Sequence, residues 1–195
     1  MQTPSLAISW WRQLAPQWKQ AFAEVIFKHT NEPTPGELAQ LYAAPALRFT
    51  GPTAPFPSMS FELSDLSGLT GLNQLETVVV THHFIESIKD LASLKQIKHL
   101  FLFNNRIKSL DGIETLAGLE QLYVQCNQIE SLEPLKNLFN LRELYVNDNK
   151  ISLLDVLTEE HAEKLEVLVC KPNEALKQKE LLRVERELGI RCRSL

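Results

Sequence analysis

Four aromatic residues recur at related positions in the middle of the chain and could bind another molecule. Phe101, Tyr123 and Tyr145 are spaced 22 residues apart, and Phe103 follows Phe101 by two residues. Aromatic side chains bury a large area on binding at a low cost in conformational entropy. If they cluster on one exposed surface, they indicate a site that recognises a protein or a peptide.

The same spacing brings polar residues to both sides of the aromatic ones. Stacked units would align Val79 and Val169 with the three rings, and residues two positions earlier and later would form flanking columns. The predicted partner-binding residues are His99, Phe101, Phe103, Gln121, Tyr123, Gln125, Glu143, Tyr145 and Asn147. In the alternative interpretation, the N-terminal helices or a second copy of the chain cover these aromatic side chains permanently.

A second group of residues could hold a metal ion or act in catalysis. His82, His83 and His99 could bind a metal with Glu86, and Cys126 could act as a nucleophile. Neighbouring strand residues point to opposite sides, which does not suit a metal site on His82 and His83. Gly-rich phosphate loops, Gly-x-Ser-x-Gly, His-Glu-x-x-His and paired-cysteine metal motifs are absent from the sequence. We predict no enzymatic activity, no metal and no cofactor, with a metal protein or enzyme using these histidines as an alternative.

A tandem repeat positions these residues. Residues 97–151 match themselves when shifted by 22 residues. The aligned columns are Leu100, Leu122 and Leu144; Leu102, Val124 and Val146; Asn105, Asn127 and Asn149; and Ile107, Ile129 and Ile151. A fixed period of this length indicates a solenoid, in which each unit buries its apolar face by stacking on its neighbours.

Each unit begins with an alternating segment that predicts a short strand with one buried face. A spacing of 22 residues leaves room for a return segment but not for a hairpin, so the strands should be parallel and form a curved sheet. The Asn column follows the strands directly. We predict a structural ladder in which Asn105, Asn127 and Asn149 pair with the backbone groups that the turn frees. The alternative role, as polar ligands of a metal or substrate, is less consistent with this register.

The N-terminal part of the chain is predicted to be helical. Ser9 could begin a helix over 9–14, Pro16 would interrupt it, and a second helix would cover 16–29. Thr34 and Pro35 favour the start of a further helix that ends before Pro45. The tryptophans of this region are interpreted as a cap on the exposed end of the solenoid.

The segments between and after the regular repeats are less uniform. Residues 50–57 are a Pro-rich connection, and 63–72 resemble half a repeat, with Phe61 in the Asn column. His83 occupies the Asn column of the next unit. Towards the end of the chain, Thr158 should cap a short helix, and Asn173 should cap a helix over 174–188 that ends at Gly189. A short final strand should turn Ile190 and Cys192 inward.

The motif LxxLxLxxNxI with this period resembles the leucine-rich repeats of the internalin and phosphatase-regulator type, and the segment 129–141 is especially similar to an internalin unit. The resemblance implies an α/β fold: a curved right-handed solenoid with a parallel sheet on its concave face. We expect an N-terminal helical cap over 1–55, about five to six repeats over 56–173, and a C-terminal capping helix and short strand over 174–195. The resemblance also implies that the protein is a scaffold that binds other proteins.

Charge and composition restrict the kinds of partner. Net charge is +1 for residues 1–55, −8 for 56–170 and +3 for 171–195, so the repeats are acidic. An acidic body argues against nucleic acid, which needs clustered Lys and Arg. The chain begins without the features of a secretory signal and has no apolar run of membrane-spanning length, which predicts a cytoplasmic protein with free, buried cysteines. The predicted partner is an unidentified protein or peptide, with a homodimer through the aromatic face as the alternative.

Overall fold

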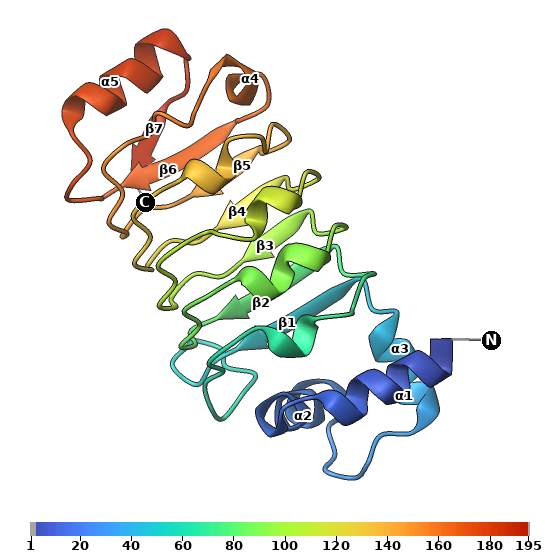
Figure 1. Ribbon diagram of the computed structural model, residues 1–195. Helices are drawn as coiled ribbons and strands as arrows, with labels where there is room; N and C mark the ends of the chain where they lie inside the picture. The colour runs from blue at the N-terminus through green and yellow to red at the C-terminus, as the bar shows by residue number, and fades with distance from the viewer. Residues whose placement is uncertain (1–2, 195) are drawn as a thin grey trace.

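The computed structural model describes residues 3–194, and within them seven parallel strands form one sheet in the order of the sequence (Figure 1). The strands are β1 (Ala46–Thr50), β2 (Thr77–Thr81), β3 (His99–Phe101), β4 (Gln121–Tyr123), β5 (Glu143–Tyr145), β6 (Val167–Lys171) and β7 (Cys192–Ser194). Each strand pairs with its sequence neighbour, as expected for a solenoid that advances by one unit per turn. The parallel sheet predicted from the repeat spacing is confirmed.

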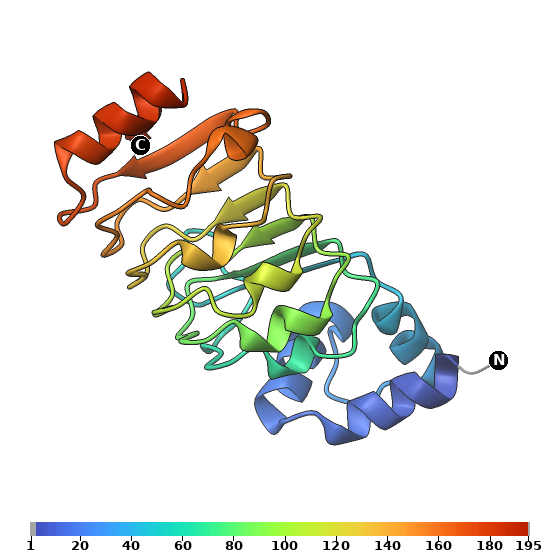
Figure 2. The ribbon, with the colours of Figure 1, turned by 45° about the horizontal axis from the view of Figure 1, so that its top comes forward.

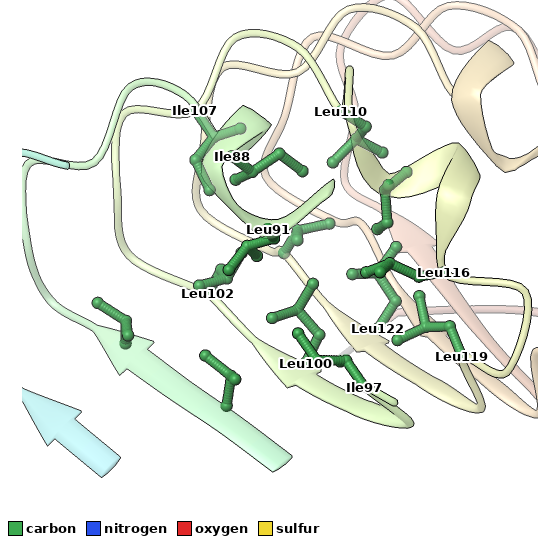
Figure 3. Close-up of a cluster of buried hydrophobic side chains, with 14 of the residues drawn as sticks. Ile88, Leu91, Ile97, Leu100, Leu102, Ile107, Leu110, Leu116, Leu119 and Leu122 are labelled. Atoms are coloured by element: carbon green, nitrogen blue, oxygen red, sulfur yellow. The ribbon is translucent and has the colours of Figure 1, made fainter. Parts of the chain in front are cut away.

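Short helices return the chain on the side opposite the sheet (Figure 2). They are the 3-10 helices η2 (Ser67–Leu69), η3 (Lys89–Ser93), η4 (Ile113–Thr115) and η5 (Glu133–Leu135), followed by α4 (Glu159–Ala162). The α4 helix begins after Thr158, which forms the predicted cap. Apolar side chains from the strands and from these return segments meet in the interior, where Leu100, Leu110 and Leu116 are fully buried (Figure 3).

The asparagines of the repeat form a continuous hydrogen-bonded ladder. The Oδ1 atom of Asn127 accepts a hydrogen bond from the Ile107 N–H at 2.9 Å, and its Nδ2 donates to the carbonyls of Leu102 and Val124, each at 3.0 Å. Asn105 and Asn149 make the equivalent contacts in the units on either side. The ladder therefore joins adjacent units through backbone groups that the turn would otherwise leave unpaired.

Asn173 extends this ladder and does not cap a helix, so that prediction is wrong. Its Oδ1 accepts from the Ile151 N–H at 3.1 Å, and its Nδ2 donates to the Val146 and Cys170 carbonyls. The helix α5 begins later than predicted and spans Gln178–Glu187. The physical reason is that Asn173 is still in register with the turns of the preceding units, where its amide is needed by the backbone.

His83 takes the place of asparagine in the second unit. Its Nδ1 accepts a hydrogen bond from the Leu63 N–H at 3.1 Å, and its side chain is buried, with 3% exposed. Burial is the main reason that the pKa of His83 falls to about 4, with the charge of His82 acting in the same direction and the Phe49 carbonyl opposing it. The imidazole is therefore neutral in the folded chain at neutral pH.

This substitution predicts a pH-dependent stability that depends on one residue. In the unfolded chain His83 takes up a proton below about pH 6.5, whereas the folded chain resists protonation until about pH 4. The contribution is thus fully present above pH 6.5 and is lost as the pH falls towards 4, by up to about 3 kcal/mol. We expect the His83→Asn variant to lack this pH-dependent contribution. As the pH falls, the free energy of unfolding of the variant should therefore rise relative to that of the wild type. Denaturant titrations from pH 7 to pH 4 measure this difference. If the free energies of unfolding of the two chains change with pH in the same way, His83 is not the source of the pH dependence.

The first unit contains a strand that the repeat pattern does not predict. Leu47 and Phe49 of β1 are in register with Val78 and Val80 of β2, 31 residues later, and they point into the core. The first unit is therefore nine residues longer than the 22-residue period, and the extra residues form a loop after β1. The segment 63–72 is the return half of this complete unit. The turn position that Asn occupies in the later units falls within the inserted loop of the first unit.

The N-terminal helices pack on the β1 end of the sheet (Figure 1). They are α1 (Thr3–Gln13), α2 (Pro16–Phe22), a π-helical turn (Ala23–Phe27) and α3 (Pro35–Tyr42). The break at Pro16 and the Thr34 cap with Glu37 are as predicted. Ser9 begins no helix, because α1 already starts at Thr3.

Trp18 fixes the position of this cap. Its ring is fully buried, it lies 5.3 Å from the ring of Phe49, and its Nε1 donates to Asp65 at 3.0 Å. Burial works to raise the pKa of Asp65, but hydrogen bonds from Ser67, Trp18 and Gln17 outweigh it and hold the pKa below its usual value. The carboxylate therefore stays ionised and accepts bonds from both the cap and the first repeat.

The C-terminal end is closed by α5 and β7. Ile190 and Cys192 are buried, as predicted, and Gly189 has a left-handed φ of +69° where the helix ends. All three cysteines are free, but only Cys170 and Cys192 are buried, whereas Cys126 is exposed. The expectation of buried thiols is therefore wrong for Cys126, because it follows β4 at the turn and points out of the core.

Candidate functional site: the strand face

The outward-pointing side chains of the strands form three columns across the sheet, and we call this surface the strand face. Strand register aligns the central column as Arg48, Val79, Phe101, Tyr123, Tyr145, Val169 and Arg193. The flanking columns contain Thr77, His99, Gln121, Glu143 and Val167 on one side, and Thr81, Phe103, Gln125, Asn147 and Lys171 on the other. The aromatic column predicted from the repeat spacing thus ends at an arginine on both sides.

The three central rings pack in a row, edge to face between Phe101 and Tyr123 and stacked between Tyr123 and Tyr145, and we call this row the stack. The ring centroids of Phe101 and Tyr123 lie 4.8 Å apart at 64°, and those of Tyr123 and Tyr145 lie 4.1 Å apart at 28°. All three rings are half-buried. Their stacking holds each ring in a defined orientation, so that a partner would meet a preformed apolar surface.

A carboxylate beside the stack is satisfied within the chain. The hydroxyl of Tyr123 donates to Glu143, and the Nε2 of Gln121 donates to the other carboxylate oxygen at 3.0 Å. Burial, and then the hydrogen bond with Glu143, raises the pKa of Tyr123, which therefore remains a protonated donor. Both oxygens of the Glu143 carboxylate therefore have a hydrogen-bond donor within the chain.

The structure brings the predicted residues together on one face, with one exception. His99, Phe103 and Gln125 are partly exposed in the flanking columns. Asn147 is in the predicted column but is fully buried, because its side chain folds against the turn, where its Nδ2 donates to Asp148 at 2.6 Å. Asn147 cannot contact a partner in this conformation, and its predicted binding role is corrected.

The N-terminal helices do not cover the aromatic stack in the described part of the chain. The rings that pack against Trp10, Trp11 and Trp18 belong to the cap or to the core, and they are Phe22, Phe27, Tyr42 and Phe49. The tryptophans thus close the end of the solenoid, and the alternative in which they bury the aromatic face is excluded for residues 3–194.

A pocket that the repeat pattern does not predict opens at one end of the strand face. The Pro-rich loop 51–57 folds over the ends of β1 and β2 and encloses about 420 Å³ against the sheet. We call this the loop pocket; it is lined by Arg48, Thr50, Ala54, Pro55, Phe56, Val79, Thr81, His82, Phe103 and Asn104. Phe56 is 84% exposed at its rim. The one signal for it in the sequence is an aromatic residue between two prolines, which is unusual for a simple connection.

Close backbone packing holds the loop in place. The Gly51 N–H donates to the Thr81 carbonyl at 2.9 Å, and a Cβ at Gly51 would lie 1.7 Å from the His82 carbonyl oxygen. The Thr50 carbonyl accepts from the N–H groups of Ser58 and Met59, which closes the loop at its other end. The loop is therefore a fixed wall of the pocket.

The residues considered for metal binding or catalysis do not converge. His83 lies in the core ladder, while His82 lines the loop pocket. Within residues 3–194, no group of three His, Cys, Asp or Glu side chains is placed to hold a metal ion. Partial burial, and then the nearby Asp148 carboxylate, raises the pKa of the Cys126 thiol, which makes it a poorer nucleophile.

No helix within the described range is both long and apolar enough to cross a membrane.

Comparison with known proteins agrees with this architecture. Residues 95–137 match the family model described as Leucine Rich repeats (2 copies), which covers β3 and β4 with their return segments. Curated proteins give no match to the sequence.

Several solved structures are similar to the chain. A leucine-rich repeat protein of Leptospira interrogans has a TM-score of 0.63 at 20% identity, covering 86% of this chain and 41% of that one. Internalin C2 of Listeria monocytogenes has a TM-score of 0.56 at 23% identity, covering 85% and 88%. The plant peptide hormone receptor RGFR1, solved in complex with RGF2, has a TM-score of 0.51 at 24% identity, covering 56% and 19%.

The chain has the fold of a leucine-rich-repeat solenoid, as its motif predicted. It spans most of internalin C2, 38% of a second Listeria internalin, and less than half of the other two proteins. This fold is typically a protein–protein interaction module.

Proposed function

We propose that the chain is a non-enzymatic interaction module that binds a protein or a peptide on its strand face. The observation that carries the proposal is the preformed stack of Phe101, Tyr123 and Tyr145, which is partly exposed and has no aromatic partner outside the strand face among the described residues. A stacked aromatic surface of this kind gains affinity because it buries area without ordering new side chains.

Two further observations support the proposal. RGFR1, whose fold is similar, was solved with RGF2 bound, so a solenoid of this type can hold a peptide ligand. The free cysteines of this chain fit a reducing compartment, and we place the module in the cytoplasm as part of the proposal.

A homodimer through the strand face is the second candidate. Two copies could bury the same rings against each other in a self-complementary contact, since the stack lies near the middle of the sheet. Light scattering over a dilution series separates the candidates, because a dimer of this kind should dissociate on dilution and should be lost with the tyrosine variants described next.

The binding test uses a double substitution, Tyr123→Ala with Tyr145→Ala. Proteins captured by the wild-type chain should be identified, purified and titrated against both chains by calorimetry. We expect the double variant to lose at least about 30-fold in affinity, because central aromatic residues contribute most of the binding energy at such surfaces.

A matched control is Leu153→Ala, which removes an apolar side chain that is 47% exposed outside the strand face. This control should bind as the wild type does, and circular dichroism should report all three chains as folded. Equal affinity of the double variant and the wild type would refute the strand-face proposal.

A further inference from the structure

Two residues that line the loop pocket carry buried polar groups that no other described residue pairs. Thr81 is 1% exposed, and its hydroxyl has no hydrogen-bond partner within the described residues. The Nδ1 atom of His82 is also buried and unpaired there. Thr81 and His82 both line the loop pocket, and buried polar groups are nearly always paired in folded proteins, so these two unpaired groups indicate a ligand group that completes them.

The protonation of His82 defines which kind of group it would bind. The Asn104 amide nitrogen can only donate, and it lies 2.9 Å from the His82 Nε2, which must therefore accept. Burial lowers the pKa of His82, so the ring is neutral and its single proton is on Nδ1. The unpaired atom is thus an N–H donor, and it calls for an acceptor.

Arg48 supplies a positive charge at the same pocket. Its side chain is exposed, and it forms no ion pair with any carboxylate in residues 3–194. The apolar lining of the pocket includes Phe103 and Val79, with the exposed Phe56 at its rim. A guanidinium, a hydroxyl and an imidazole N–H around an apolar pocket fit a carboxylate that is carried beside an apolar group.

The charges of the whole strand face extend this pattern. Arg193 ends the central column on the far side, Lys171 lies next to it, and neither forms an ion pair within the described range. Glu143 is the one carboxylate among the strand-face residues defined above; it lies between the two cationic ends, and its two oxygens already accept hydrogen bonds from Tyr123 and Gln121. The face is therefore cationic at both ends and aromatic between them, on a chain whose net charge is −4.

The distance between the two cationic ends fits an extended peptide. Six strand spacings of about 4.8 Å separate Arg48 from Arg193 by roughly 29 Å, which about nine extended residues would span. A peptide has a single C-terminus, so at least one of the two cationic ends requires a carboxylate on a side chain, and a segment inside a longer chain requires side-chain carboxylates at both. The loop pocket would then receive one acidic residue, and the β6–β7 end would receive another.

We propose that the ligand of the strand face is an extended peptide segment with two acidic residues about nine positions apart and apolar residues between them, one of which inserts its carboxylate into the loop pocket against Arg48, Thr81 and His82. The proposal rests on the proposed function and adds the chemistry of the partner.

The test begins with a displayed library of random peptides of about twelve residues, selected on the full chain at low salt. We expect the selected peptides to be enriched in Asp or Glu pairs at the stated separation. The tightest peptide, synthesised with both ends blocked, should bind at least about tenfold more weakly to Arg48→Gln than to the wild type. A version of the peptide in which the acidic residue is replaced by its amide should lose a similar factor in affinity for the wild-type chain. The two changes combined should lose no more than either alone, and Arg48→Glu should recover affinity for a peptide with arginine at that position.

The hydroxyl of Thr81 is tested by an isosteric substitution. Thr81→Val should weaken binding of the same peptide about fivefold without lowering the melting temperature, because the hydroxyl has no hydrogen-bond partner among residues 3–194. The matched control is Thr70→Val, which changes an exposed threonine in the return segment after η2, outside the strand face and the loop pocket, and which should bind as the wild type does.

The outcomes distinguish the two proposals. Selected peptides that need Tyr123 and Tyr145 but tolerate Arg48→Gln would overturn the acidic-ligand proposal and leave the proposed function standing. Peptides that bind only with a free C-terminal carboxylate would overturn the proposal that an acidic side chain enters the loop pocket. Selection of no peptide at all, or of peptides indifferent to every strand-face change, would overturn both.

Discussion

Asn127→Ala is expected to lower the free energy of unfolding by about 3–4 kcal/mol. The substitution leaves the Ile107 N–H without an acceptor and removes one donor each from the Leu102 and Val124 carbonyls, all close to the core. Because Asn127 joins the central units, its loss weakens the stacking on which a solenoid depends. Denaturant titration followed by circular dichroism measures the change.

Two companion variants make this prediction specific. Asn137→Ala removes an exposed asparagine from a return segment and should change the stability by less than about 0.5 kcal/mol. Asn127→Asp keeps the acceptor but points a carboxylate at two carbonyl oxygens, so its penalty should shrink when acid protonates it and restores a donor. An Asn127→Ala chain as stable as the Asn137→Ala chain would show that the ladder contributes little.

Trp18→Ala should destabilise the chain by about 3–5 kcal/mol. The ring is fully buried between the cap and the first unit, so its removal leaves a cavity next to Phe22 and Phe49. The substitution also takes a donor from Asp65, whose carboxylate lies at the junction of the cap and the repeats. Thermal and denaturant unfolding of the full chain report the loss.

The packing partner of Trp18 offers an independent check. A Cβ at Gly68 would lie 2.0 Å from the Trp18 ring, so Gly68→Ala should displace the ring and reproduce much of the destabilisation. Leu6→Ala is the control, since Leu6 belongs to the same cap but is 54% exposed, and it should change the stability by less than about 0.5 kcal/mol. If both core variants unfold like the control, the cap is not held by Trp18.

These stability predictions and the binding predictions concern alternate residues of the same units. Along β4, Leu122 is buried in the core while Gln121 and Tyr123 point to the strand face. Substitutions on the strand face should therefore alter binding with small effects on folding, whereas substitutions in the ladder or the cap should do the reverse. This separation makes the binding tests interpretable.

The regular repeats are predictable because their determinants are local. The 22-residue period fixes which residues alternate between core and surface, and this alone predicts that Phe101, Tyr123 and Tyr145 share one column. The same alternation fails at Asn147, because the side chain bends back to Asp148 at the turn. Alternation predicts the side of the sheet, but it does not predict such a local hydrogen bond.

The irregular first unit is not predictable in the same way. β1 lies 31 residues before its partner strand, so the repeat spacing gives no sign of it, and the inserted loop resembles a simple connection. Asn173 is ambiguous for a related reason, since both a helix cap and a ladder position favour asparagine. Only the register of β6 with its neighbours distinguishes the two roles.

The sequence by itself determined the solenoid, its parallel sheet, the Asn ladder of the central units and the aromatic column of the strand face, because each follows from a period that repeats along the chain. Only the tertiary structure decided how that column ends. It brought Arg48 and Arg193 into register with the rings, and it folded the loop 51–57 over Thr81 and His82 to form the loop pocket. Those contacts join segments that no repeat relates, and their geometry depends on how the chain packs in three dimensions.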